Sequence, residues 1–162
     1  MEKEKNHLND KWILWAHLPH DIDWTLSSYK EIVEIDSVED GLCIFENLPE
    51  ILVKNCMLFL MRKGINPVWE DENNKEGGCF SYKINSKNAQ VIWNNLSYTL
   101  MGETLSSDDI SNTINGITIS PKKNFCIIKI WISNCKNSNP NIISEIEGLN
   151  SLGCMFKKHM DN

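Results

Sequence analysis

The stretch from residue 79 to residue 101, CFSYKINSKNAQVIWNNLSYTLM, combines the two patterns that decide the fold class. Its first part, Cys79–Asn85, alternates apolar and polar side chains and predicts a β-strand. Its second part, Ser86–Met101, places apolar side chains at helical spacing and predicts a helix. This apolar stripe consists of Ala89, Ile92, Trp93, Leu96 and Leu100. Such a helix, directly after a strand, is expected to pack its stripe on a sheet.

Segments with strand patterns lie on both sides of this stretch and are separated by Gly, Pro or Asn. Most of them are short and are either alternating or continuously apolar. They are Lys11–Ala16, Tyr29–Ile35, Asn55–Arg62, Gly116–Ser120 and Phe125–Ser133. Because the connections between them are short, we expect neighbouring strands to pair in antiparallel fashion.

Two more helices are predicted outside the central stretch. Ser37 begins Ser-Val-Glu-Asp, a typical helix start with acids in the first turn, and this helix would end near Asn47. Pro140 stands where a first helical residue would, and the helix after it would end near Gly153. Its apolar stripe would consist of Ile142, Ile143, Ile146 and Leu149. We therefore predict an α+β fold, an antiparallel sheet of about six to eight strands with three helices on one face.

Length and composition predict one domain and exclude several classes of protein. With 162 residues, the chain has room for a flexible N-terminal tail, residues 1–7, and a single domain, residues 8–162. The six cysteines contain no C-x-x-C pair and the chain has no secretory h-region, so we expect reduced thiols in a cytoplasmic protein. The longest apolar run, Cys56–Met61, is far too short to cross a bilayer. A net charge of −6 argues against non-specific nucleic-acid binding.

Tryptophan is unusually frequent, with six residues in the chain. Four of them, at positions 12, 15, 93 and 131, fall inside strand or helix patterns and are expected in the core. Trp24 and Trp69 fall in polar loops instead. Each of these two could cover an edge of the core, but loop residues of this kind are also candidates for ligand contact.

The most specific motif of the chain is residues 64–78, which read GINPVWEDENNKEGG. Other landmarks are Trp12-x-x-Trp15, Trp24, Asp36-Ser37-Val38-Glu39-Asp40, Trp93 followed by Gly102-Glu103, Gly116 and Ile130-Trp131. In these landmarks the sequence resembles the translation initiation factor 4E family, whose members bind the 5′ cap of mRNA. The resemblance covers most of the chain. It implies a curved antiparallel sheet backed by three helices on its convex face, with a slot on the concave face for the 7-methylguanine of the cap.

The resemblance also assigns roles in this cap slot. Trp24 and Trp69 would stack on the two faces of the base, which is positively charged and gains both stacking and cation–π attraction. Glu70 would accept hydrogen bonds from the guanine N1–H and amino group, and the backbone N–H of Trp69 would bind O6. Trp131 matches the tryptophan at the methyl edge of the base, although ordinary strand core remains an equal alternative. Asp71 is expected to anchor its loop.

The phosphate contacts depart from the family pattern. Cys79 stands where the family has an arginine that supports the acidic residue of the slot, so this support must come from elsewhere. Ile127 stands where the family has a lysine that contacts the phosphates. Lys122 matches the first phosphate-binding arginine, so charge is kept while the bidentate guanidinium is lost. With Lys123 it could bind the cap phosphates or form a solvated turn. Strand alternation places Lys129 on the same face as Ile127 and Trp131, so we expect Lys129 to replace the lost lysine. Near the C-terminus, Cys154–His159 resembles the last strand of the family sheet.

The convex, helical face is the second family surface, where scaffold factor 4G and 4E-binding repressors dock an amphipathic helix. Val38 matches the family, but Leu42 replaces an exposed tryptophan and Gly41 precedes it. Asn94 and Asn95 replace a Leu-Glu pair that touches the partner. Since such interfaces rest on a few apolar anchors, we expect weakened binding to the usual scaffold or a dedicated, divergent partner.

The sequence offers no convincing catalytic or metal site. The pattern His17-x-x-His20-Asp21 has metal-like composition but reads better as a solvated loop, and the acids around Glu70 lack a nucleophile or phosphate loop. We predict a non-enzymatic, cofactor-free and metal-free monomer that binds capped mRNA and recruits it to a 4G-like scaffold for translation initiation. Two alternatives remain open: a repressor or cap-shielding protein that does not engage this scaffold, and an interaction module with a degenerate slot.

Overall fold

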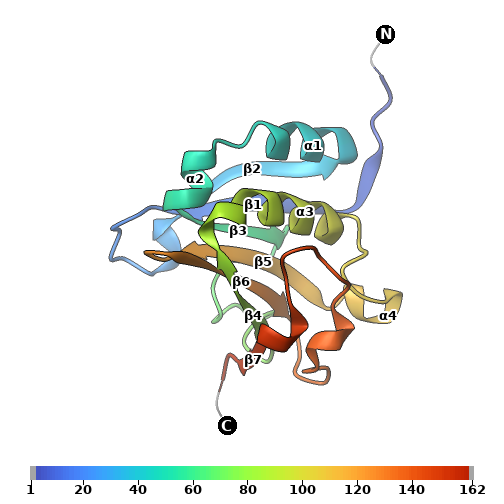
Figure 1. Ribbon diagram of the computed structural model, residues 1–162. Helices are drawn as coiled ribbons and strands as arrows, with labels where there is room; N and C mark the ends of the chain where they lie inside the picture. Colours follow the sequence, from blue (N-terminus) through green and yellow to red (C-terminus); the bar gives the residue numbers. More distant parts are fainter. Residues whose placement is uncertain (1–2, 161–162) are drawn as a thin grey trace.

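The computed structural model describes residues 3–160, which form one antiparallel sheet with helices on one face (Figure 1). The seven strands are arranged in the order β2-β1-β3-β5-β6-β4-β7. The strands are β1 His7–His17, β2 Tyr29–Ser37, β3 Met57–Arg62, β4 Gly78–Asn85, β5 Ile114–Pro121, β6 Phe125–Ile132 and β7 Met155–Lys158. The helices are α1 Val38–Glu46, α2 Glu50–Asn55, α3 Ala89–Met101 and α4 Asp108–Ser111. The predicted α+β class and antiparallel pairing are confirmed.

Helices α1, α2 and α3 cover the same face of the sheet and enclose the main core (Figure 1). The stripe predicted for α3 is buried throughout, and Trp93 and Leu96 are fully inaccessible. Helix α1 begins as predicted, because the Ser37 side chain accepts a hydrogen bond of 3.1 Å from the backbone N–H of Asp40. No helix within residues 3–160 has the length and apolar character needed to span a membrane.

Strand alternation divides the sheet into two chemically different faces. On β6, Ile128, Ile130 and Ile132 point into the core beneath the helices. Trp131 belongs to a separate small cluster with Phe59 and Met61 on the opposite face. We call this opposite face the concave face. The slot is predicted on this face, whereas the helical face carries most of the apolar burial.

The prediction of a helix from Pro140 to Gly153 is wrong. The segment forms two short 3-10 turns, Pro140–Ile142 and Ser151–Gly153, joined by irregular backbone. Asn139 and Asn150 favour this form because their side chains accept hydrogen bonds from backbone N–H groups two residues later. Gly148 has a φ of +93°, which ends any regular helix there. The third helix on the sheet is instead α2, where the sequence analysis predicted none.

The N-terminal segment contacts the helical face before β1 begins. The Lys5 ammonium lies 3.1 Å from the Asp40 carboxylate, and the Asn6 side chain donates to Glu39 over 2.7 Å. These contacts involve residues within the predicted tail, and the boundary between tail and domain at residue 8 stays a prediction.

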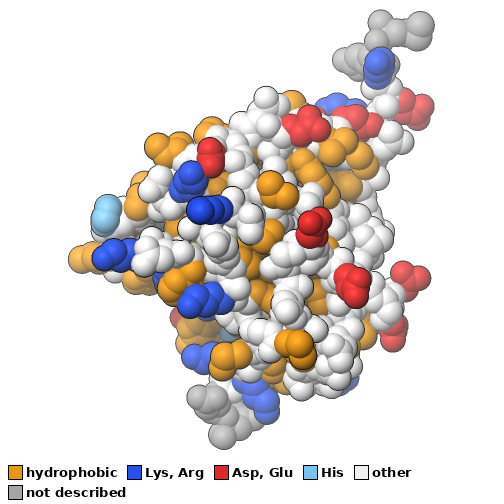
Figure 2. All heavy atoms as spheres, viewed as in Figure 1, with side chains coloured by type: hydrophobic (Ala, Val, Ile, Leu, Met, Phe, Trp, Pro, Cys, Tyr) orange, Lys and Arg blue, Asp and Glu red, His pale blue; other side chains and the backbone are white. Residues whose placement is uncertain are grey.

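Charges are distributed unevenly over the molecule (Figure 2). Apart from the N-terminal segment, Lys and Arg side chains gather on the left and lower parts of this view, and most acids lie toward the top and right. The single arginine, Arg62, is 8% exposed and lies inside the fold. Its guanidinium binds Glu103, Asp10 and the carbonyl oxygens of Ile114 and Ser111. Arg62 is therefore a structural residue, and anion binding at the surface falls to lysines.

Candidate functional site

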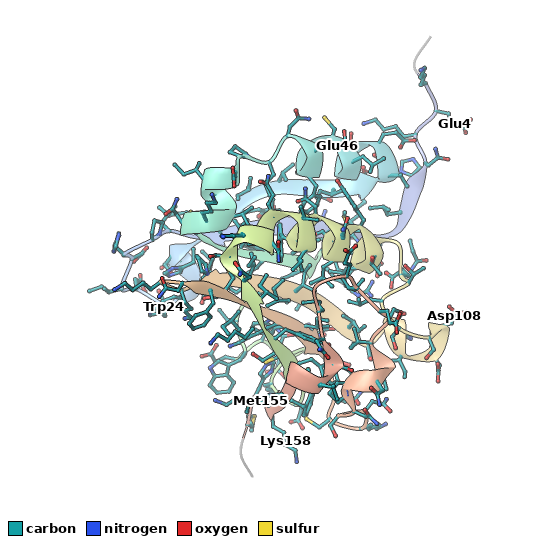
Figure 3. All side chains as sticks on the ribbon, viewed as in Figure 1. Glu4, Trp24, Glu46, Asp108, Met155 and Lys158 are labelled. Atoms are coloured by element: carbon teal, nitrogen blue, oxygen red, sulfur yellow. The ribbon has the colours of Figure 1, made fainter. Side chains whose placement is uncertain are left out.

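Trp24 lies in the loop between β1 and β2 at one rim of the sheet, and 55% of its side chain is exposed (Figure 3). Asp23 shapes this loop by accepting hydrogen bonds from the backbone and side chain of Thr25. One indole face is stacked on His17, with ring centroids 3.8 Å apart and planes 2° from parallel. His17 is held in turn by a 2.7 Å hydrogen bond between its Nε2 and the Asp23 carbonyl. Because His17 covers one face, a planar ligand has only the other face of Trp24 available.

Trp69 and Glu70 lie in the long loop between β3 and β4, and the Trp69 side chain is 45% exposed. Asp71 anchors this loop, as the sequence analysis expected. Its carboxylate accepts hydrogen bonds from the backbone N–H of Asn66 at 3.0 Å and of Asn73 at 2.8 Å. The Asp71 carboxylate therefore holds the two ends of this loop segment together, and the neighbouring Trp69 and Glu70 side chains are exposed on the surface of the protein.

A buried asparagine pair ties the same loop to the sheet. Asn74 is fully buried, and its side-chain amide donates to the carbonyl oxygens of Asn66 and Val68. Asn115, on β5, donates to the Asn74 side-chain oxygen over 2.9 Å. The Asn74 carbonyl is also bonded to Nδ1 of His159, beyond β7, at 2.8 Å. The Trp69 loop is thus held by groups from both the middle and the edge of the sheet.

Trp131 forms part of the concave face beneath these loops. It is 7% exposed, and its Nε1–H donates a 2.9 Å hydrogen bond to the Thr118 hydroxyl. The His159 ring lies against it, with centroids 5.0 Å apart. Phe59 and Met61 pack beside it, so the indole is both a core residue and a part of this face. The two alternatives raised for Trp131 are therefore compatible.

The Glu70 carboxylate influences the pKa of two side chains of the concave face, Tyr29 and His159. Burial raises the pKa of Tyr29, and Glu70 raises it further. Burial lowers the pKa of His159, where the Asn74 hydrogen bond and Glu70 act in the opposite direction. Tyr29 also packs edge-on against Trp24, with ring centroids 6.5 Å apart. Both tryptophan loops therefore contribute to one region of the concave face.

Glu70 is available as a hydrogen-bond acceptor. Its side chain is exposed, and no protein donor binds its carboxylate within residues 3–160. With cysteine at position 79, the support that an arginine would give to Glu70 has to come from another residue. Cys79 is buried on the neighbouring strand and provides no such donor to Glu70. A ligand with two adjacent N–H groups would satisfy this carboxylate.

The predicted phosphate lysines occupy different places. Lys122, at the β5–β6 turn, lines a cavity of about 380 Å³ together with His17 and Trp24. Lys123 lies in the same turn and is exposed, but does not line this cavity. Lys129 lies in the middle of β6, opposite Thr118 on β5 and Ser81 on β4. Lys122 is thus close to the Trp24 loop, and Lys129 is close to Trp131.

The predicted partner surface is only partly assembled. Val38 and Leu42 are exposed by 42% and 41% and line an apolar cavity of about 170 Å³ between α1 and α3. Gly41 and Tyr98 also line it. Asn94 does not line this cavity, and its side-chain amide donates to the Phe45 carbonyl over 3.1 Å. Asn94 therefore connects α3 to α1.

Several residues that shape the site were not predicted from the sequence. His17 and Tyr29 pack around Trp24, His159 packs on Trp131, and Asn74 and Asn115 hold the Trp69 loop. The prediction of a solvated loop is wrong for His17, which is the last residue of β1 and is buried against Trp24. The asparagines carried no signal, because isolated asparagines are common in loops.

Comparisons with known proteins agree with this geometry. The family model described as eukaryotic initiation factor 4E matches residues 7–161. The chain is 27% identical over 161 residues to the eukaryotic translation initiation factor 4E of Candida glabrata, covering 95% of this chain and 71% of that one. It is 26% identical over 162 residues to the Homo sapiens factor of the same name, covering 96% and 70%.

Two solved structures share the fold. Ascaris suum eIF4E-3 in complex with m7G cap superposes with a TM-score of 0.76 at 20% identity, over 98% of this chain and 94% of that one. The complex of C. elegans eIF4E-3 with the 4E-binding protein Mextli and cap analog gives 0.73 at 22% identity, over 82% and 76%. Together with the match of the family model to residues 7–161, these likenesses establish that the chain is a divergent member of the eukaryotic initiation factor 4E family.

Proposed function

We propose that this protein binds the 7-methylguanosine 5′ cap of mRNA on the concave face of its sheet and serves translation initiation. The observation that carries the proposal is the exposed Glu70 carboxylate, which has no protein donor within residues 3–160 and lies next to the exposed Trp69, together with a second exposed indole, Trp24, that packs against Tyr29 of the concave face. Methylation at N7 makes the base cationic, which favours stacking between electron-rich rings. A guanine also presents two adjacent N–H donors that match one carboxylate, whereas adenine does not.

The remaining concave-face residues take supporting roles in this proposal. His17 holds Trp24 in place through the stacked ring pair, so the base would use the open indole face. Trp131 would contact the methyl edge of the base. Lys122, Lys123 and Lys129 would face the phosphates from the β5–β6 turn and from β6. The cap-bound relatives from Ascaris and C. elegans, which share the fold, support this assignment.

We further propose that the helical face binds a scaffold or a 4E-binding protein. The exposed Val38 and Leu42 side chains and the apolar cavity between α1 and α3 offer anchors for an amphipathic helix. The structure of the C. elegans relative with Mextli supports this kind of partner. We expect a non-enzymatic role in the cytoplasm.

A second candidate function is repression or cap shielding without the usual scaffold. Asn94 favours it, since its amide is bonded to the Phe45 carbonyl instead of being presented to a partner. Binding of a 4G peptide would decide between the two. Saturable binding at micromolar concentration supports recruitment, and no binding by a protein that still binds the cap supports repression.

Titration of the intrinsic tryptophan fluorescence tests the cap slot. We expect saturable quenching by 7-methyl-GTP and much weaker quenching by GTP. Glu70→Gln should lose the response to 7-methyl-GTP, because it replaces one acceptor oxygen with a donor. Glu72→Gln is the matched control in the same loop, since the Glu72 side chain is 84% exposed and, among residues 3–160, pairs only with Lys75. Equal quenching by both nucleotides, or equal titration curves for the two variants, would contradict the proposed function.

A further inference from the structure

The concave side of β6, β4 and β7 carries a row of side chains that ends at the sheet edge. Trp131 on β6 is directly opposite Cys79 on β4, and Cys79 is directly opposite Lys157 on β7. Directly paired residues of an antiparallel sheet point to the same face with Cβ atoms about 5 Å apart. Lys157 therefore stands two strands from Trp131, with the short Cys79 side chain between them.

The packing of the flanking residues confirms which way β7 faces. Phe156 packs on Phe80, with ring centroids 5.0 Å apart, and both belong to the core under the helices. His159 packs instead on Trp131. Residues 157 and 159 thus share the concave face, while residues 156 and 158 share the helical face. Lys157 and Lys158 are adjacent lysines on opposite sides of the same edge strand.

Lys129 brings a second positive charge to the same place. It lies opposite Ser81 in the next row of pairs, on the same face as Trp131. Burial raises the pKa of the Cys79 thiol, and Lys129 and Lys157 both act in the opposite direction, so both cations lie close to Cys79. Within residues 3–160, neither lysine has a carboxylate in salt-bridge range, although other lysines do. The lower part of the molecule, where β7 lies in Figure 1, is also rich in Lys side chains in Figure 2.

We propose that Lys157, together with Lys129, forms a phosphate-binding subsite beside Trp131 at the β4–β7 edge of the concave face. The subsite rests on the proposed cap-binding function and names a residue that takes part in it. Its ligand is a phosphate of the capped RNA, from either the cap triphosphate or the nucleotides that follow it. Cys79 is buried between Trp131 and Lys157, and the exposed Lys157 brings a cation to this row from the edge of the sheet. Positive charge lost at position 79 is thus restored by a different strand.

Affinity measurements on Lys157→Gln and Lys158→Gln test the subsite. The two variants remove the same charge from adjacent, exposed positions on opposite faces, so net charge and strand propensity change equally. Three ligands are titrated by fluorescence: 7-methylguanosine without phosphates, 7-methyl-GTP, and a short capped RNA. Urea denaturation of both variants checks that the fold is retained.

We expect Lys157→Gln to weaken 7-methyl-GTP binding about three- to fivefold, as for the loss of one exposed ion pair, with no change for 7-methylguanosine. A larger loss for capped RNA than for 7-methyl-GTP would assign the contact to the following nucleotides, and an equal loss would assign it to the triphosphate. Identical affinities of Lys157→Gln and Lys158→Gln for all ligands, or equal weakening of 7-methylguanosine itself, would overturn the subsite. If the wild-type protein binds 7-methyl-GTP no better than GTP, the proposed function fails and the subsite with it.

Discussion

Replacing Asn74 by alanine should loosen the loop that carries Trp69 and Glu70. The fully buried Asn74 side chain donates to two carbonyl oxygens, at 3.1 and 2.9 Å, and accepts one bond of 2.9 Å from Asn115. Each such bond contributes about 1 kcal/mol net, and more when its partner is left buried without a replacement. Asn74→Ala should therefore lower the free energy of unfolding by about 3 kcal/mol.

Urea denaturation of Asn74→Ala and Asn73→Ala provides the measurement and its control. Asn73 is adjacent but exposed, and its side chain makes one bond of 3.0 Å, to Asp71, so its replacement should cost less than about 0.5 kcal/mol. Asn74→Ala should also weaken 7-methyl-GTP binding more than Asn73→Ala does, because Trp69 and Glu70 lie in the released loop. A loss of stability below about 1 kcal/mol for Asn74→Ala, or equal effects of the two variants, would refute the reasoning.

Three further predictions concern the interior and the sheet edge. Arg62→Lys should lower the free energy of unfolding by about 3 kcal/mol in urea denaturation. Lysine cannot replace the guanidinium contacts to the Asp10 and Glu103 carboxylates and to the backbone carbonyls. An unchanged urea midpoint would contradict this. Because burial lowers the pKa of His159 below its ordinary 6.5, its contribution to stability is present above pH 6.5 and is lost as the pH falls through the lowered value. His159→Gln should flatten that decline between pH 7 and pH 5, and a decline of the same steepness would argue against it. Gly77→Ala should prevent folding, since its Cβ would lie 1.8 Å from the carbonyl oxygen of Ile132 on β6. Gly153→Ala is the control, because its Cβ would meet no atom within 4 Å. Native circular dichroism spectra for both variants would refute the steric argument.

The local patterns of the chain predicted most of the fold. Strand alternation identified β6 and the face on which Trp131 lies, and the serine at position 37 identified the start of α1. These signals are local, because the period of a strand or a helix and the chemistry of a cap involve residues a few positions apart. The prediction of a helix from Pro140 to Gly153 is wrong for the same reason, because it used only the local apolar spacing. The apolar spacing of this segment is helical, but asparagine side chains and Gly148 give its backbone other hydrogen bonds and a turn.

The sequence by itself determined the class of fold, the pair of loop tryptophans with Glu70, and the resemblance to the 4E family. Only the tertiary structure decided which distant residues meet at the site. Three contacts join segments from different strands or loops: His159 on Trp131, Asn115 with Asn74, and Lys157 beside Cys79. Strand order and register create these contacts, and they depend on packing of the whole sheet, which no short stretch of sequence encodes.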